Sequence, residues 1–170
     1  MRILGALFDL DGTLLDTEPL YDEAEQKIIN LYGNGNLLDS ATKQQLLGTP
    51  AEINCKLLVE KYQVKLTPKE FQKMRDELLI EPFRNSKFKK GAKELVHKIK
   101  FDLGLKTAIA TGSNKFNFDN KFYNNQNWLN KYIDIVITAD DINRGKPNPD
   151  IFLVAAKELE LRPNQCIVFE

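Results

Sequence analysis

The feature that most constrains the fold is the short apolar segment at residues 3–8 (ILGALF), which leads directly into two acidic residues, Asp9 and Asp11. A nearly continuous apolar segment of this length is typical of a parallel strand that is covered on both faces. In open parallel sheets, ligands bind outside the carboxyl ends of the strands. Two carboxylates there can bind Mg²⁺ through oxygen, and they can serve as nucleophile and as acid or base. The alternative for a bare Asp-x-Asp-Gly is a polar turn, in which both residue types are common.

Length, charge and cysteine content exclude several classes of protein. The chain has 170 residues, enough to bury a substantial core. Its 24 basic and 24 acidic residues give a net charge of zero, which argues against binding nucleic acid through the phosphates. Two distant cysteines, Cys55 and Cys166, indicate no disulfide framework, and no apolar segment is long enough to span a bilayer. We therefore expect a cytoplasmic monomer that contacts neither nucleic acid nor membrane.

Three further apolar segments, at residues 105–110, 133–138 and 166–169, have the length and composition of buried strands. Helical patterns separate them, including a partly helical crossover at residues 117–130 whose buried side we assign to Phe116, Phe122, Trp128 and Leu129. Strands that alternate with helices predict right-handed crossovers and a parallel sheet. The predicted fold class is therefore α/β, with a Rossmann-like parallel sheet as its core.

Between the first two strands, residues 17–86 show only helical patterns. Two helix starts are clear, at Thr49 and Thr67, because each threonine precedes a proline and is followed three residues later by glutamate. Thr17 is a third candidate cap. We expect residues 17–86 to form a helical domain inserted beside the site, with residues 1–16 and 87–170 forming the α/β core.

Polar groups follow each predicted strand, and the carboxyl ends of parallel strands meet at one edge of a sheet. Besides the two aspartates, the second strand is followed by Thr111 and Gly112, the third by Lys146 and the fourth by Glu170. Phosphoryl transfer requires a positioned nucleophile, a divalent metal and donors for the phosphoryl oxygens. The set of residues therefore predicts phosphoryl-transfer chemistry.

These motifs resemble, in order and over the whole chain, those of the haloacid dehalogenase superfamily of phosphohydrolases. The matching segments are residues 9–16, Thr111, residues 145–150 and residues 168–170. The resemblance implies that Asp9 attacks phosphorus to form an aspartyl-phosphate, and that Asp11 protonates the leaving oxygen and then activates water. It also implies Mg²⁺ bound by Asp9, the main-chain carbonyl of Asp11 and acids of the last motif, here Glu170.

By the same resemblance, Thr111 and Gly112 bind the substrate phosphate, Lys146 neutralises charge, and the helical block corresponds to the family's cap. The last motif of the family continues into a further aspartate, whereas this chain ends at Glu170. We therefore expect a C-terminally truncated chain with weakened metal binding and catalysis.

The expected function is Mg²⁺-dependent hydrolysis of a small phosphomonoester, such as a nucleoside, sugar or polyol phosphate. Residues 116–121 (with Phe118 and Lys121), 135–141 and 145–152 are together similar to the branch that contains pseudouridine 5′-phosphatases and glycerol-phosphate phosphatases. Two alternatives are a non-catalytic or impaired protein of the same fold and a sugar phosphomutase. The loop at residues 47–49 resembles the cap loop that approaches the site, although it also fits a helix boundary.

Overall fold

The computed structural model describes residues 2–170. Within them, four parallel strands form one sheet in the order β3-β2-β1-β4. The strands are β1 (Gly5–Phe8), β2 (Lys106–Ala110), β3 (Ile135–Ile137) and β4 (Cys166–Phe169). The sheet confirms the predicted α/β class.

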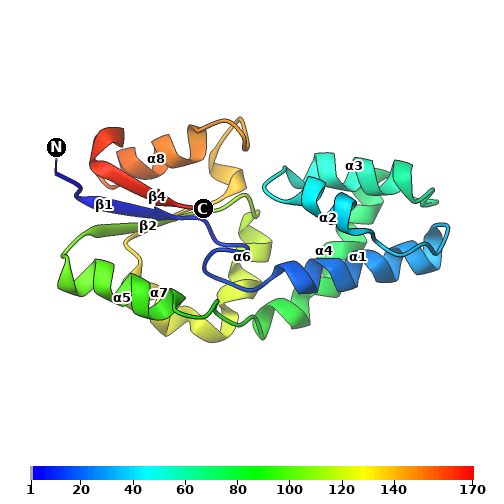
Figure 1. Ribbon diagram of the computed structural model, residues 1–170, viewed down its shortest axis with the longest axis horizontal. Coiled ribbons are helices and arrows are strands. Elements are labelled where there is room, and N and C mark those ends of the chain that lie inside the picture. The colour runs from blue at the N-terminus through cyan, green and yellow to red at the C-terminus, as the bar shows by residue number, and fades with distance from the viewer. Residues whose placement is uncertain (1) are drawn as a thin grey trace.

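The first strand lies at the centre of the sheet, between β2 and β4. All four residues of β1 are buried, and Phe8 pairs in register with Ile109 on one side and Phe169 on the other. The carboxyl ends of the strands point toward the helical half of the molecule (Figure 1). The acidic loop therefore leaves the sheet at the centre of that edge.

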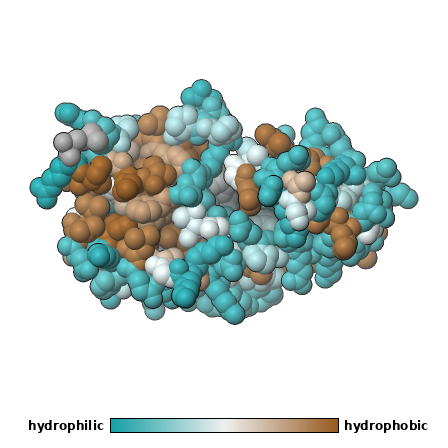
Figure 2. Space-filling view, in the orientation of Figure 1, coloured by the Kyte–Doolittle hydropathy of each residue, from teal (hydrophilic) through white to brown (hydrophobic). Residues whose placement is uncertain are grey.

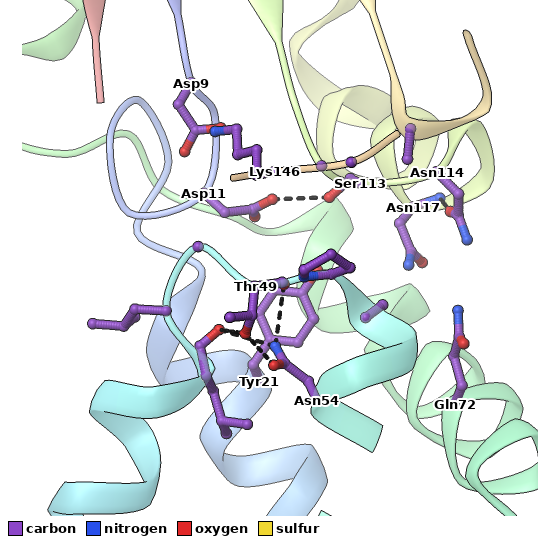
Figure 3. A pocket seen from close by; sticks show the side chains of 18 of the residues that line it. Asp9, Asp11, Tyr21, Thr49, Asn54, Gln72, Ser113, Asn114, Asn117 and Lys146 are labelled. Carbon is purple, nitrogen blue, oxygen red and sulfur yellow. Dashed lines mark hydrogen bonds and ion pairs between the residues drawn. The ribbon is translucent and has the colours of Figure 1, made fainter. Parts of the chain in front are cut away.

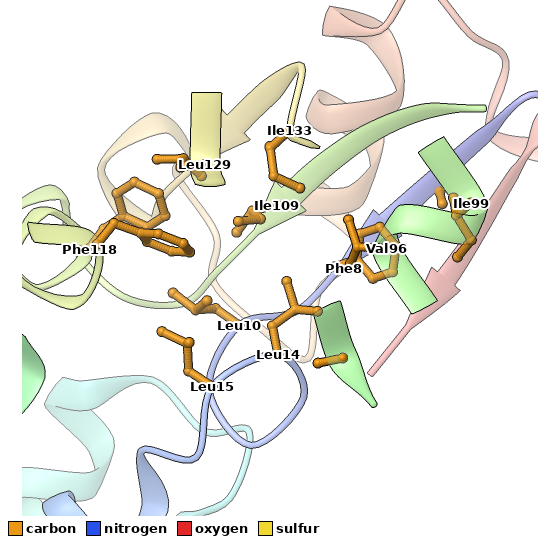
Figure 4. Packing of buried hydrophobic residues seen from close by; sticks show 13 residues of the cluster. Phe8, Leu10, Leu14, Leu15, Val96, Ile99, Ile109, Phe118, Leu129 and Ile133 are labelled. Atoms are coloured by element: carbon orange, nitrogen blue, oxygen red, sulfur yellow. The ribbon is translucent and has the colours of Figure 1, made fainter. Parts of the chain in front are cut away.

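Helices cover both faces of the sheet (Figure 1). On one face, Phe8 and Ile109 pack with Val96, Phe118 and Leu129 (Figure 4). On the other, Leu7 packs against a helix through Ile151 and Ala155. Alternate residues of β1 thus enter opposite cores, and each large apolar side chain that is fully buried contributes about 1.5–3 kcal/mol. The covering elements are α5 (Ala92–His97), a π-helical turn (Lys98–Asp102), α6 (Lys115–Phe122), a 3₁₀ turn (Tyr123–Asn125) and α7 (Gln126–Tyr132) on the first face and α8 (Asp150–Glu158) on the second.

The crossover after β2 is helical, as predicted, and Phe122, Trp128 and Leu129 pack in the core as assigned from the sequence, whereas the assignment of Phe116 to the buried side was wrong. Phe116 is 52% exposed, whereas Phe118 is 3% exposed and packs on Phe122. The reason is the position at which α6 begins. Asn114 is its N-cap and accepts a hydrogen bond from the Asn117 N–H through Oδ1, and this start determines which residues of α6 face the core. Positions 118 and 122 then share the inner face, and position 116 turns outward.

Residues 18–84 form four helices that pack mainly on one another, away from the sheet (Figure 1). Their own apolar core contains Ile28, Ile29, Leu58 and Phe71. The chain passes into this block through residues 16–17 and leaves it through residues 85–87, where the Asp16 N–H donates to the Lys87 carbonyl at 2.8 Å. The helices are α1 (Glu18–Tyr32), α2 (Ser40–Leu46), α3 (Ala51–Lys61) and α4 (Pro68–Arg84).

Of the three predicted threonine caps, only Thr67 caps a helix through its side chain. Its hydroxyl accepts from the Glu70 N–H, and the Glu70 carboxylate accepts from the Thr67 N–H at 2.8 Å. The prediction was wrong for Thr49, whose hydroxyl donates to the Leu46 carbonyl of the preceding helix. Thr17 does stand at the N-cap position of α1, as predicted, but its hydroxyl donates to Asp11 and caps no backbone N–H of the helix.

Strand β4 forms one edge of the four-stranded sheet and presents apolar side chains at the surface. Ile167 is 42% exposed and Val168 is 41% exposed. Figure 2 shows hydrophobic residues gathered over this part of the molecule. Among residues 2–170, no helix has the length and apolar character needed to cross a membrane.

Candidate active site

The acidic loop is fixed by backbone hydrogen bonds and a glycine. The Asp9 N–H donates to the Phe169 carbonyl at 2.8 Å, which extends the β1–β4 pairing by one residue. The loop then turns through Gly12, whose φ of +77° favours glycine and where a Cβ would lie 2.9 Å from Glu18 Oε1. Leu10 and Leu14 are buried beneath it. The chain therefore holds the carboxylates of residues 9 and 11 at defined places above the sheet.

Lys146 connects two of the predicted site carboxylates. Its Nζ lies 2.8 Å from Asp9 Oδ1 and 2.6 Å from Glu170 Oε1. Figure 3 shows Lys146 beside Asp9 at the top of the cavity. The structure thus brings together residues that follow β1, β3 and β4, although Asp9 and Lys146 are 137 positions apart in the sequence.

The electrostatics of this group follow from burial and the ion pair. Burial raises the pKa of Asp9, and the Lys146 ammonium only partly offsets that effect. For Lys146, burial lowers the pKa, but Asp9 and Glu170 outweigh it and the net change is upward. The lysine is therefore a fixed cation at neutral pH, next to a poorly solvated carboxylate.

Asp11 is held by a different partner, Lys121 of α6. Lys121 Nζ lies 2.5 Å and 2.7 Å from the two carboxylate oxygens of Asp11, and the lysine side chain is fully buried. Thr17 and Ser113 donate hydroxyl hydrogen bonds to the same carboxylate, at 2.5 Å and 2.8 Å. Figure 3 shows the contact between Asp11 and Ser113. The sequence prediction gave Lys121 no role in the site; its spacing from Phe118 on one helix face was the available signal.

These contacts decide the protonation state of Asp11. Burial alone would raise the pKa of its carboxyl group, but the Lys121 ammonium and the two hydroxyl donors outweigh burial and lower it. Burial likewise acts to lower the pKa of Lys121, and Asp11 and Tyr21 reverse that effect. The pair is therefore ionised at neutral pH in this arrangement.

The turn after β2 places its residues at different depths. Thr111 is fully buried, and its hydroxyl accepts from the Ser113 N–H at 3.1 Å. Gly112, Ser113 and Asn114 line the cavity instead. Of the two predicted phosphate-binding residues on this turn, Gly112 faces the cavity and Thr111 lies beneath it.

A cavity of about 660 Å³ lies between the strand ends and the helical block. Asp9, Asp11 and Lys146 line it from the core. The loop at residues 47–49 lines it from the opposite side and also forms the boundary after α2, where Leu47 is the C-cap. The helical block further contributes Tyr21, Asp22, Glu25, Lys43, Asn54, Gln72 and Arg75.

The donor chemistry of this edge fits a hard divalent cation that retains water. Residues 2–170 contain no group of three or more His, Cys, Asp or Glu side chains arranged to hold a metal by themselves. Mg²⁺ commonly uses only one or two carboxylates, completed by water and substrate phosphate oxygens. Asp9 and Glu170 supply two such carboxylates, and both lie within 3 Å of the same Lys146 ammonium.

Comparison with known proteins agrees with this geometry. Residues 3–170 match the family model of haloacid dehalogenase-like hydrolases. The chain is 30% identical over 167 residues to the phosphorylated carbohydrates phosphatase of Thermotoga maritima, which covers 98% of this chain and 75% of that protein. It is 30% identical over 176 residues to a protein of Drosophila melanogaster named "Probable pseudouridine-5′-phosphatase", which covers 99% of this chain and 74% of that protein.

The fold is also that of a solved relative. The crystal structure of CbbY from Rhodobacter sphaeroides in complex with phosphate matches with a TM-score of 0.81 at 22% identity, over 98% of this chain and 77% of that one. The resemblance expected from the motifs is thereby confirmed. The chain belongs to the haloacid dehalogenase-like hydrolase family.

Proposed function

We propose that this hydrolase is a Mg²⁺-dependent phosphatase that cleaves a small phosphomonoester through an aspartyl-phosphate on Asp9. The observation that carries the proposal is the Asp9 carboxylate at the end of β1, 2.8 Å from the Lys146 ammonium and open to the 660 Å³ cavity. A desolvated carboxylate next to a fixed cation is suited to attack a dianionic phosphate, because the cation offsets the repulsion between the two anions.

In the first step, a bond forms between an Asp9 oxygen and phosphorus, and the bond from phosphorus to the leaving oxygen breaks. Lys146 binds the phosphoryl oxygens together with Gly112, which lines the cavity at the exposed point of the turn after β2. Asp9, the main-chain carbonyl of Asp11 and Glu170 would hold Mg²⁺, which when bound neutralises charge on the phosphoryl group.

We assign the proton transfers to Asp11. Its ionised form, as paired with Lys121, suits the second step, in which a base takes a proton from the water that attacks the aspartyl-phosphate. Protonating the leaving oxygen in the first step requires Asp11 to carry a proton, so the carboxyl must then separate from Lys121. The helical block acts as a cap that excludes water while this happens.

Support for a phosphatase also comes from the names of the relatives, which are phosphatases for phosphorylated carbohydrates and for pseudouridine 5′-phosphate. Because the two names give different substrates, they support hydrolysis of a phosphomonoester more strongly than they support any particular leaving group. We propose that the substrate is a small phosphorylated metabolite.

The test is release of 4-nitrophenol from p-nitrophenyl phosphate with and without Mg²⁺. The wild type should turn over only with the metal, and Asp9→Asn should lower kcat by at least about a thousandfold because no other carboxylate can replace the nucleophile. Asp16→Asn is the matched control, since Asp16 follows in the same loop, is 47% exposed and pairs with Lys89. Equal loss in both variants, or full activity of Asp9→Asn, would refute the assignment of the nucleophile.

A further inference from the structure

The wall of the cavity on the α6 side contains an amide that has no partner. Asn117 lines the cavity and is 3% exposed. Its side-chain oxygen Oδ1 is buried and has no hydrogen-bond partner within residues 2–170. A buried acceptor without a donor is unfavourable, and native proteins rarely leave one unsatisfied unless water or a ligand completes it.

The side chain of Asn117 is placed to meet a ligand. Its backbone N–H is held by Asn114 Oδ1 at 2.8 Å, which fixes the start of α6. Figure 3 shows Asn117 reaching from the core side, and Gln72 of α4 reaching from the helical block, toward the same space. A donor placed between the two amides would satisfy the unpaired oxygen.

The charges around this space are already compensated. Each lysine or arginine that lines the cavity has a carboxylate partner: Lys43 with Asp22 at 2.6 Å, Arg75 with Glu25 at 3.5 Å and Lys146 with Asp9 at 2.8 Å. Lining acids outnumber lining bases, since Glu18, Asp11 and Asp140 are also present. A second phosphate or a carboxylate in the cavity would therefore meet acids and no unpaired cation, which disfavours it.

We propose that the part of the cavity facing the helical block is a subsite for a neutral, polyhydroxylated leaving group, and that Asn117 Oδ1 accepts a hydrogen bond from one of its hydroxyls. Amide side chains suit hydroxyls because they offer donors and acceptors without charge. Leu46, Pro50 and Ile142, which also line the cavity, supply apolar surface for the carbon skeleton. This subsite rests on the proposed phosphatase function and narrows its substrate to sugar- or polyol-like monophosphates.

The experiment compares kcat/KM for four kinds of phosphate ester. They are p-nitrophenyl phosphate, the best substrate among glycerol, pentose and hexose monophosphates, its monodeoxy analogues, and the corresponding bisphosphate. For one deoxy analogue, the kcat/KM of the wild type should be about tenfold or more below that for the parent substrate, because Asn117 Oδ1 is then left without a donor. The wild type should also turn over the bisphosphate at least about tenfold less efficiently than the monophosphate.

The variant is Asn117→Leu, which removes the acceptor at similar volume. It should lower kcat/KM for the hydroxylated substrate about tenfold, abolish discrimination against the deoxy analogue, and lower kcat/KM for p-nitrophenyl phosphate by a clearly smaller factor than for the hydroxylated substrate. Asn117→Asp retains an acceptor and should keep the discrimination. Asn120→Leu is the matched control, since Asn120 is 8% exposed on the same helix and its side chain donates to the Phe116 carbonyl.

The outcomes separate the two proposals. If the wild type hydrolyses p-nitrophenyl phosphate but treats deoxy analogues or the bisphosphate like the parent sugar phosphate, the subsite is overturned and the phosphatase stands. An unchanged Asn117→Leu profile means that water alone satisfies Oδ1, which also overturns the subsite. If no phosphate ester is hydrolysed, the proposed function fails and the subsite fails with it.

Discussion

Lys121 and Asp11 form an ion pair in which the ammonium lies 2.5 Å and 2.7 Å from the two carboxylate oxygens. The lysine side chain is completely buried, and its ammonium also lies 4.5 Å from the centre of the Phe83 ring in α4. The pair therefore joins the acidic loop of the core to a residue of the helical block. Removing one partner of such a pair leaves an uncompensated buried charge.

Lys121→Met should destabilise the protein by about 3–5 kcal/mol, because the Asp11 carboxylate would keep only its two hydroxyl donors. Adding Asp11→Asn should recover much of that loss, since neither charge is then unpaired. Urea denaturation of the two single variants and the double variant measures the coupling. Lys115→Met is the control on the same helix, where the lysine is 63% exposed and the expected change is below about 1 kcal/mol. Strict additivity of the two site substitutions would contradict the prediction.

Glu25 should make stability depend on pH. Burial raises its pKa from 4.5 to about 7, against the opposing effect of Arg75. The folded protein therefore binds a proton that the unfolded chain releases, so this contribution is largest below pH 4.5 and is lost as pH rises to about 7. Through this group, the free energy of unfolding should fall by about 3 kcal/mol between low pH and pH values above 7. Glu25→Gln should lack this decline between about pH 5 and pH 8 in urea denaturation, whereas Glu23→Gln, at an exposed position of the same helix, should retain it. Parallel pH profiles for wild type and Glu25→Gln would count against the raised pKa.

Metal removal should abolish turnover reversibly. Treatment with EDTA should stop hydrolysis of p-nitrophenyl phosphate, and Mg²⁺ should restore it. Glu170→Gln should raise the Mg²⁺ concentration for half-maximal activity roughly tenfold, because one of the two carboxylates beside Lys146 is lost. Glu158→Gln, at an exposed position of α8, should leave that concentration unchanged. An identical metal requirement in both variants would remove Glu170 from the metal site.

The two threonine–proline helix starts should respond differently to substitution. Thr67→Ala removes both hydroxyl contacts with Glu70 and should cost about 1 kcal/mol of unfolding free energy. Thr49→Ala should cost less, about 0.5 kcal/mol or below, because its hydroxyl caps no N–H of α3. Thermal unfolding of the two variants gives the comparison, and a larger effect at Thr49 would be unexpected.

Sequence reasoning succeeded where local pattern and strand-end geometry were enough. The apolar segments gave the four strands, and parallel pairing of β1 with β2 and β4 required their carboxyl ends to meet. Asp9, Lys146 and Glu170 could therefore be placed at one edge before any contact was known. The contacts of the last two residues, 24 positions apart, follow from that same edge.

Sequence reasoning failed where a side chain had competing partners. Thr17 and Thr49 both precede helices, but neither caps its helix through the side chain. The Thr17 hydroxyl donates to Asp11, and the Thr49 hydroxyl donates to the Leu46 carbonyl. Lys121 is 110 positions from Asp11 in the sequence, and a lysine in a helix is ordinarily a surface residue. Its burial depends on how α6 packs against α4 and the acidic loop, which no local pattern encodes.

The cavity wall is divided between two units that have separate apolar cores; the chain passes between them at residues 16–17 and 85–87, and they also pack on one another through α4 and α6. Asp9 and Lys146 depend on the packing of the sheet, whereas Gln72 and Arg75 depend on the packing of α4 against α1 and α3. Substitutions in the helical half can therefore change that side of the cavity wall without altering the packing that holds Asp9, the proposed nucleophile. Such a division would let one reaction be retained through evolution while its substrate changes, and it makes the helical half the place to begin when redirecting the enzyme toward a new phosphate ester.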